Sequence, residues 1–139
     1  MKEYKINIDK SKEVFNKCKS HIAIKECYNN VFRVSTDYSK NFNNNKWRVT
    51  YGYMTVTVNL LCRHCFIIDE NNEVIDPTIL LTFKGEAPQY FAMKIFDNYN
   101  EYLSAIERER RFPALNFYLR NEDFQAEKWA QKNNYILIG

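Results

Sequence analysis

The chain has 139 residues, with 20 Lys and Arg against 17 Asp and Glu, and a formal net charge of +3. This length is typical of one domain, so we expect a single domain over residues 1–139 that buries enough surface to fold without disulfides. The small net charge does not favour nucleic acid as a partner, and only three glycines argue against a glycine-rich phosphate loop. The sequence contains no long uncharged apolar run of the kind that crosses a membrane.

The cellular compartment is predicted from the N-terminal residues and the cysteines. The first ten residues are polar and charged, unlike a secretory signal peptide. Four cysteines without an export signal are expected to be free thiols in a reducing environment. We therefore expect a cytoplasmic protein that is not attached to a membrane.

Two helices are predicted near the start of the chain, after a short edge strand over residues 4–8. Apolar residues recur at steps of three and four over residues 11–22 and again over 24–35, as they do in amphipathic helices. Residues 37–46 are rich in Asn and have no sustained period, so a loop is expected there.

Strands are predicted in the middle of the chain. Residues 47–61 combine alternating polarity with a β-branched run, which favours a strand. Gly52 within it indicates a bulge or a close approach of another backbone. Residues 63–69 and 74–78 are expected to form two further strands joined by a turn at 70–73.

The last part of the chain is predicted to be mostly helical. A strand over residues 90–96 is followed by helices over 98–110 and 121–132, and residues 135–138 are expected to close as a strand. Helices, then strands, then helices favour the α+β class. We expect N-terminal helices packed on a small antiparallel sheet, with further helices after it.

The most informative stretch runs from Cys62 to Thr78 and reads CRHCFIIDENNEVIDPT. It places His64 and Asp76 on neighbouring strands, and Cys27 on a predicted helix. A thiol attacks a carbonyl carbon only as the thiolate, so it needs a base within hydrogen-bond reach. A carboxylate on the other ring nitrogen then orients the imidazole. The three residues are therefore candidates for nucleophile, base and orienter, in that order along the chain.

The register of the two strands decides whether His64 and Asp76 can meet, because side chains alternate between the faces of a sheet. A loop with an odd number of residues, such as 71–73, puts them on one face. A two-residue turn at Asn71-Asn72 puts them on opposite faces. Asn-Asn suits either geometry, so both alternatives stay open from the sequence.

Each candidate also has a purely structural interpretation. A cysteine on a helix face is usually a small core residue, and Glu26 would oppose a neighbouring thiolate. Ser20 is the best predicted helix cap, which would leave Cys27 about two turns into the helix, where the helix dipole has little effect. His64 can be a core histidine, and Asp76 can simply end a strand.

Metal and nucleic-acid sites are weaker alternatives. Cys62 and Cys65 form a C-x-x-C pair, but a structural zinc site needs a second pair, and Cys18 and Cys27 lie on predicted helices. The run over residues 107–111 alternates in charge, which is typical of a solvated helix end. Other basic residues are scattered, so neither metal nor nucleic acid is our expectation.

The motifs together resemble a group of small bacterial and phage proteins with papain-like or transglutaminase-like character. Their pattern is Cys-aromatic-x-Asn, a Gly-Tyr strand, His-x-aromatic and a hydrophobic pair before Asp-Pro-Thr. The matching pieces in this chain are Cys27-Tyr28-Asn29-Asn30, Tyr51-Gly52-Tyr53, His64-Cys65-Phe66 and Val74-Ile75-Asp76-Pro77-Thr78. The resemblance covers about residues 22–80. The chain departs from the pattern at Cys65, where a small residue is usual, and at Phe66, which replaces a Trp.

The resemblance implies Cys27 as nucleophile, His64 as base and Asp76 as orienter, with no metal and no cofactor. Asn30 would lie one turn from Cys27 and help to hold the site. From these motif pieces Asn30, Tyr53 and Phe66 are our candidates for substrate binding.

The expected reaction is acyl transfer through a thioester, on a protein or peptide substrate. Hydrolysis, deamidation and amide exchange all belong to this class. The alternative from another class is a binding module on the same scaffold without turnover, such as a phage-encoded inhibitor of a host protein.

Overall fold

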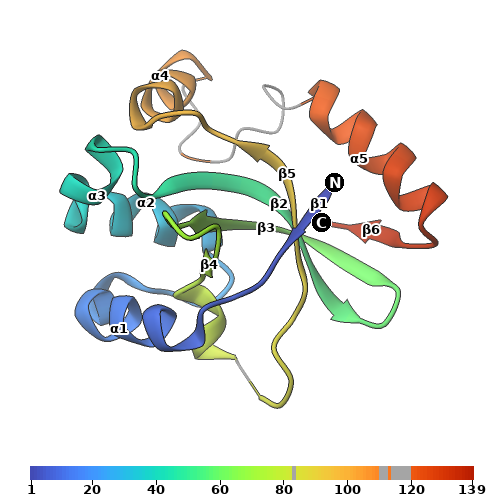
Figure 1. Ribbon diagram of the computed structural model, residues 1–139, viewed down its shortest axis with the longest axis horizontal. Helices are drawn as coiled ribbons and strands as arrows, with labels where there is room; N and C mark the ends of the chain where they lie inside the picture. Colours follow the sequence, from blue (N-terminus) through green and yellow to red (C-terminus); the bar gives the residue numbers. More distant parts are fainter. Residues whose placement is uncertain (83, 110–112, 114–119) are drawn as a thin grey trace.

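One six-stranded sheet forms the centre of the protein (Figure 1). The computed structural model describes residues 1–82, 84–109, 113 and 120–139. The strands are β1 (Lys2–Tyr4), β2 (Arg48–Thr57), β3 (Leu60–Ile68), β4 (Val74–Ile75), β5 (Tyr90–Ile95) and β6 (Ile136–Ile138). They lie in the order β1-β5-β2-β3-β4, and β6 pairs with β3 as well. The predicted α+β class is confirmed, although β6 runs parallel to β3 in an otherwise antiparallel set of strand pairs.

Helices precede and follow the strands, as expected. Those described are α1 (Ile8–Cys18), α2 (Cys27–Asp37), α3 (Ser39–Asn43), α4 (Tyr99–Glu109) and α5 (Arg120–Lys132), with 3₁₀ turns at Lys19–His21 and Thr78–Leu81. Arg110, the predicted end of the helix before α5, lies outside the described residues. Within the described ranges, no helix combines the length and apolar composition that a bilayer crossing requires.

Three predicted boundaries in the N-terminal part are wrong for local reasons. Helix α1 begins earlier than predicted because the side chain of Asn7 caps it, accepting a hydrogen bond from the Lys10 backbone at 2.9 Å. Helix α2 begins later, at Cys27, because Lys25 has a φ of 62°, which no helix can contain. Helix α3 replaces a predicted loop, and its Phe42 is buried edge-on against Trp47.

The predicted strands are also divided differently. The long strand over 47–61 is two strands, since β2 ends at Thr57 and the chain turns before β3 begins at Leu60. The return strand over 74–78 shrinks to Val74–Ile75. Pro77, which has no N–H to donate, leads instead into the 3₁₀ turn.

The pairing of β3 with β4 has the register that a shared face requires. Ile67 pairs with Ile75, and the Asp69 backbone N–H donates to the Glu73 carbonyl at 2.9 Å, which leaves the three residues 70–72 as the loop. Asn72 has a φ of 58°, a conformation that Asn tolerates well. The loop is thus odd-numbered, so residues 64 and 76 lie on the same face of the sheet.

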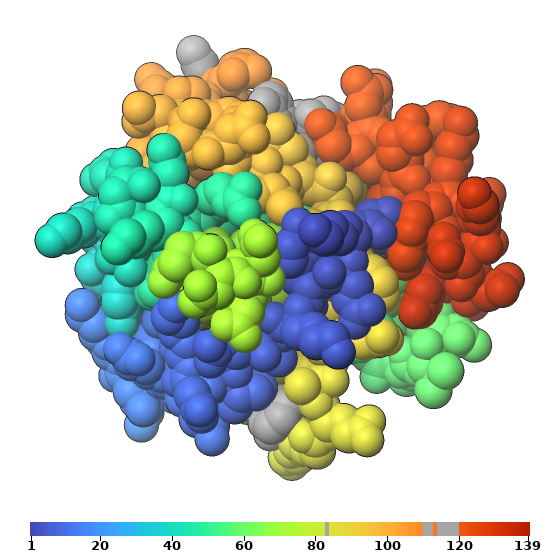
Figure 2. Space-filling model, viewed as in Figure 1, coloured from blue at the N-terminus to red at the C-terminus, as the bar shows by residue number. Residues whose placement is uncertain are grey.

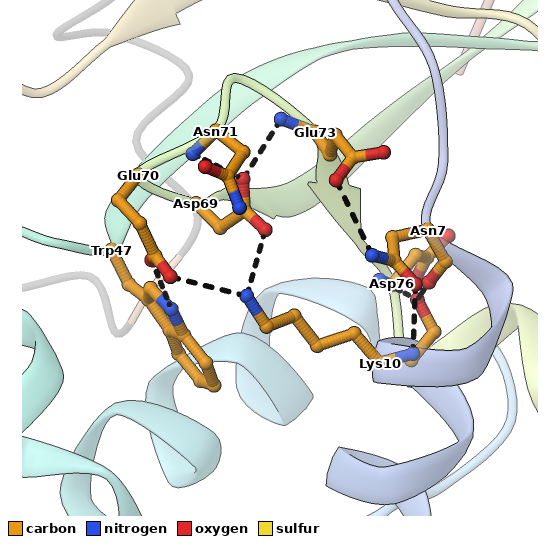
Figure 3. A network of polar contacts seen from close by, with 9 residues as sticks. Asn7, Lys10, Trp47, Asp69, Glu70, Asn71, Glu73 and Asp76 are labelled. Carbon is orange, nitrogen blue, oxygen red and sulfur yellow. Dashed lines mark hydrogen bonds and ion pairs between the residues drawn. The ribbon is translucent and has the colours of Figure 1, made fainter.

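A polar network holds this loop against helix α1 (Figure 3). Lys10 Nζ contacts Asp69 Oδ2 at 3.0 Å and Glu70 Oε1 at 3.2 Å. Asp69 Oδ1 accepts from the backbone N–H groups of Asn71 and Glu73, both at 2.9 Å. The Asp69 side chain therefore fixes the loop conformation, and with it the register of β4.

The two faces of the sheet are covered by different parts of the chain. The main apolar cluster includes Tyr51, Cys65 and Ile67 of the sheet and residues of α1, α2, α3 and α4. On the opposite face, Phe66 and Tyr90 pack with partly buried residues of the N-terminal segment. Figure 2 shows that segment in blue, between the green β3–β4 turn and the red C-terminal residues.

The outer edge of β3 carries a gap between two short strands. β4 pairs with Ile67 and Ile68 at one end of β3, and β6 pairs with Leu60 to Cys62 at the other. Within the described part of the chain, no strand pairs with residues 63–66 on that side. His64 lies in this gap.

Gly52 on β2 lies opposite His64 and is approached closely by β5. The β2–β5 register shifts between Tyr51 and Gly52, and a Cβ added at Gly52 would lie 2.0 Å from the Phe91 carbonyl oxygen. The predicted bulge and close approach are both confirmed. No side chain fits here without displacement of the β5 backbone.

We therefore expect Gly52→Ala to lower the free energy of unfolding by about 3 kcal/mol, because overpacking against backbone is costly. Denaturant unfolding followed by circular dichroism measures this change. Thr57→Ala, at the exposed end of the same strand, is the control and should change stability by about 0.5 kcal/mol or less. Equal effects of the two substitutions would contradict the prediction.

Candidate active site

His64 and Asp76 form a buried pair. His64 Nε2 lies 2.7 Å from Asp76 Oδ2, and the exposed fractions of the two residues are 7% and 0%. β3 supplies the histidine, and the aspartate follows β4 directly. The pair meets because the two strands are in the register described above.

Asp76 is held by three further hydrogen bonds from different parts of the chain. The Tyr90 hydroxyl on β5 donates to Asp76 Oδ2 at 2.7 Å, the same oxygen that contacts His64. The Thr78 backbone N–H donates to Oδ1 at 3.1 Å. The backbone N–H of Asp76 itself donates to Ser11 Oγ at 3.0 Å, which links the aspartate to α1. These contacts leave the carboxylate one orientation.

The charge of Asp76 governs the protonation of His64. Burial of the imidazole lowers its pKa, but the negative charge of Asp76, the hydrogen bond to it and the contact with Cys27 together raise the pKa of His64 to about 10. The imidazolium form is therefore favoured at neutral pH. Because Nε2 is occupied by Asp76, Nδ1 is the ring nitrogen that remains for Cys27.

Cys27 is the first residue of helix α2, not a residue two turns inside a helix as Ser20 capping would require. Its side chain is half-buried and lines the same cleft as the His64 imidazole, whose pKa it helps to raise. The start of a helix carries partial positive charge from unpaired backbone N–H groups, which stabilises a thiolate. Glu26 Oε1 accepts from Asn29 Nδ2 at 3.0 Å, so its carboxylate is engaged along the helix.

The segment before Cys27 is fixed by Asn30. Its side chain exchanges two hydrogen bonds with the Ala23 backbone, at 2.7 and 3.0 Å, and donates to Thr78 Oγ1 at 2.9 Å. Thr78 thus joins the helix start to Asp76. Between Ala23 and Cys27, Lys25 adopts a left-handed conformation that costs a non-glycine residue about 1–2 kcal/mol. Strain of this kind is common next to functional groups.

A cleft of about 310 Å³ opens beside Cys27 and His64, and we call it the Cys27 cleft. The residues that line it are Ile24, Lys25, Cys27, Met54, Cys62, Arg63, His64, Thr78, Ile79 and Thr82. The thiol and the imidazole therefore face a space that a substrate can enter.

The other cysteines lie in different surroundings. Burial raises the pKa of the Cys18 thiol to about 12 and that of Cys65 well above its usual value. Cys62 lines the Cys27 cleft, whereas Cys65 points to the opposite face of the sheet because the two lie three positions apart on one strand. They cannot share a metal ion, and the described residues contain no cluster of three or more metal-ligating side chains.

The three candidates for substrate binding are all buried. The exposed fractions of Asn30, Tyr53 and Phe66 are 0%, 3% and 0%, and none of them lines the Cys27 cleft. Phe66 stacks beside the His64 ring, with centroids 6.3 Å apart. Asn30 and Phe66 contact residues of the candidate site on the side away from the cleft. Their place in the structure suits them to position those residues and does not suit them to contact a substrate.

Tyr90 and Ser11 are site residues that the sequence did not indicate. Both act through Asp76, and both are distant from it along the chain. In the sequence, Tyr90 is only a tyrosine on a predicted strand. Its hydroxyl needs a hydrogen-bond partner if it is buried, but the sequence does not indicate which partner it has.

The chain matches no protein-family model, no curated protein and no solved structure. The resemblance to papain-like and transglutaminase-like proteins therefore rests on the motif residues alone. The geometry of Cys27, His64 and Asp76 is the basis for a proposal about function.

The raised pKa of His64 predicts that stability falls at alkaline pH. The ordinary value is 6.5 and the folded value is about 10, so the extra stability is complete below about pH 6.5 and is lost as pH rises to about 10. Between these values the free energy of unfolding should fall with rising pH relative to that of His64→Gln, because the folded state gives up the proton that stabilised it. Urea unfolding of both proteins from pH 6 to 10 measures the difference. If the free energies of unfolding of the two proteins changed in parallel with pH, the pKa of His64 would not be raised in the folded state.

Removal of the Tyr90 hydroxyl should destabilise the protein. Tyr90→Phe deletes a hydrogen bond to a buried carboxylate, which is worth about 1.5–3 kcal/mol. Thermal unfolding at neutral pH tests this loss.

Tyr102→Phe is the matched control for Tyr90→Phe. Its buried hydroxyl has no hydrogen-bond partner among the described residues, so its removal should be neutral or slightly stabilising. A loss of stability as large for Tyr102→Phe as for Tyr90→Phe would mean that the Asp76 contact contributes nothing specific.

Proposed function

We propose that this protein is a cysteine-dependent acyl-transfer enzyme with a papain-like or transglutaminase-like fold. The observation that carries the proposal is the buried His64, paired with the Asp76 carboxylate and lining one cleft with the Cys27 thiol at the start of a helix. A core cysteine and a core histidine would need neither the ion pair nor the adjoining cleft.

In the proposed first step the Cys27 thiolate attacks a carbonyl carbon of the substrate. The carbon–sulfur bond forms, the bond to the leaving amine breaks, and the His64 imidazolium gives its proton to that amine. Asp76 keeps the ring oriented and stabilises its charged form throughout. The Cys27 backbone N–H, which has no partner within the helix, is available to the developing oxyanion.

In the second step water or an amine attacks the thioester, and neutral His64 takes a proton from the attacking group. The carbon–sulfur bond breaks, which releases the product and restores the Cys27 thiolate and the His64 imidazolium. Water gives hydrolysis of a peptide bond or deamidation of a side-chain amide, whereas an amine gives amide exchange. A protein or peptide substrate fits both outcomes. These steps require no metal or organic cofactor.

The test is the reactivity of Cys27 toward iodoacetamide at about pH 6, followed by mass spectrometry of each cysteine. Cys27 should be alkylated at least tenfold faster than Cys62, a half-buried thiol of the same cleft, since only the thiolate reacts. His64→Ala should remove this advantage. His21→Ala, which replaces the other histidine at an exposed position, should preserve it.

A second measurement tests acylation of Cys27 by an activated acyl donor. p-Nitrophenyl acetate should transfer one acetyl group to Cys27 and release one equivalent of nitrophenolate in a burst that His64→Ala abolishes. If Cys27 reacts no faster than Cys62 and takes up no acetyl group, the enzyme is excluded and a binding module on this scaffold takes its place.

A further inference from the structure

The walls of the Cys27 cleft combine apolar side chains with positive charge. Ile24, Met54 and Ile79 supply apolar surface, and Ile24 is 56% exposed although it is large and apolar. Lys25 and Arg63 supply positive charges, beside His64, whose charge is paired with Asp76. No Asp or Glu is among the described residues that line the cleft. A cavity of about 310 Å³ with such walls suits an apolar side chain with a negative group beside it.

The uncompensated charge of the cleft belongs to Lys25. Arg63 is already paired, with Nη2 2.8 Å from Asp123 Oδ1. Lys25 is exposed and makes no ion pair within the described part of the chain. The nearest acidic residue in the sequence, Glu26, accepts a hydrogen bond from Asn29 and does not line the cleft.

The backbone of Lys25 is constrained where it meets the cleft wall. Its φ of 62° is a conformation that Gly or Asn adopts more easily, so a lysine there is not explained by the turn itself. Asn30 anchors Ala23 on one side of it, and helix α2 begins at Cys27 on the other. The lysine is therefore held at the cleft wall two residues before Cys27.

We infer that the Cys27 cleft selects an acidic peptide, in which an apolar side chain enters the cleft and a carboxylate beside it faces Lys25. The inference rests on the proposed function and adds the substrate class to it. Lys25 is the specificity-determining residue. It acts on the substrate's charge, while the chemistry stays with Cys27 and His64.

The charge preference can be measured without the natural substrate by alkylating Cys27 with anionic iodoacetate and neutral iodoacetamide. In each case the thiolate displaces iodide and forms a carbon–sulfur bond, so the ratio of the two rates reports the local charge. Lys25→Gln should lower the ratio about threefold, and Lys25→Glu about five- to tenfold. Lys40→Gln, an exposed lysine on α3, should leave it unchanged. Salt at 0.5 M should reduce the difference between the proteins.

Dipeptide aldehydes test the peptide itself by protecting Cys27 from iodoacetamide. An N-acetyl dipeptide aldehyde that contains Leu and Glu should protect at several-fold lower concentration than its Leu and Gln counterpart, and Lys25→Gln should remove the difference.

The failure of this inference is distinguishable from the failure of the proposed function. Cys27 could react rapidly with iodoacetamide while Lys25 substitutions change neither the ratio of the iodoacetate and iodoacetamide rates nor the peptide preference. That result would refute the acidic-peptide inference and leave the proposed enzyme function intact. If Cys27 reacts no faster than Cys62, both proposals fall together.

Discussion

The buried pair of His64 and Asp76 is the interaction on which the rest of the structure depends. A carboxylate without exposed surface is strongly destabilising unless every lone pair is satisfied. Asp76 meets this condition only when the imidazole, the Tyr90 hydroxyl and the Thr78 backbone arrive together, from β3, β5 and the 3₁₀ turn. The order of strands, the register of β4 and the docking of α1 through Ser11 are all needed to keep this one charge inside the protein.

The α+β class and most helices and strands could be predicted because they follow from local periodicity. The candidate triad could be named, but its assembly could not, because an Asn-Asn turn suits either register. The Asp69 side chain decides between the two registers by binding Asn71 and Glu73, and its own position depends on Lys10 of α1. Such a long-range dependence leaves no periodic pattern in the sequence.

The start of α2 was missed for a similar reason. Apolar periodicity continues back to Ile24, whereas the helix begins at Cys27, because the side chain of Asn30 holds the Ala23 backbone and Lys25 turns left-handed. The difference of a few residues changes the chemistry. It makes the thiol the first residue of the helix, at the end that stabilises negative charge.

The gap at the edge of β3 has a consequence for the way the protein is made. Cys27, His64 and Asp76 precede two elements in the chain and are synthesised before them. These are β6, which borders the gap, and Asp123 of α5, which pairs with Arg63 at the cleft wall. A nascent chain on the ribosome can therefore bring the thiol and the imidazole together before the second side of the gap exists. The long sequence separation between β3 and β6 makes their pairing a late folding event. The cleft wall at Arg63 would then be completed last, after the C-terminal segment has joined the sheet.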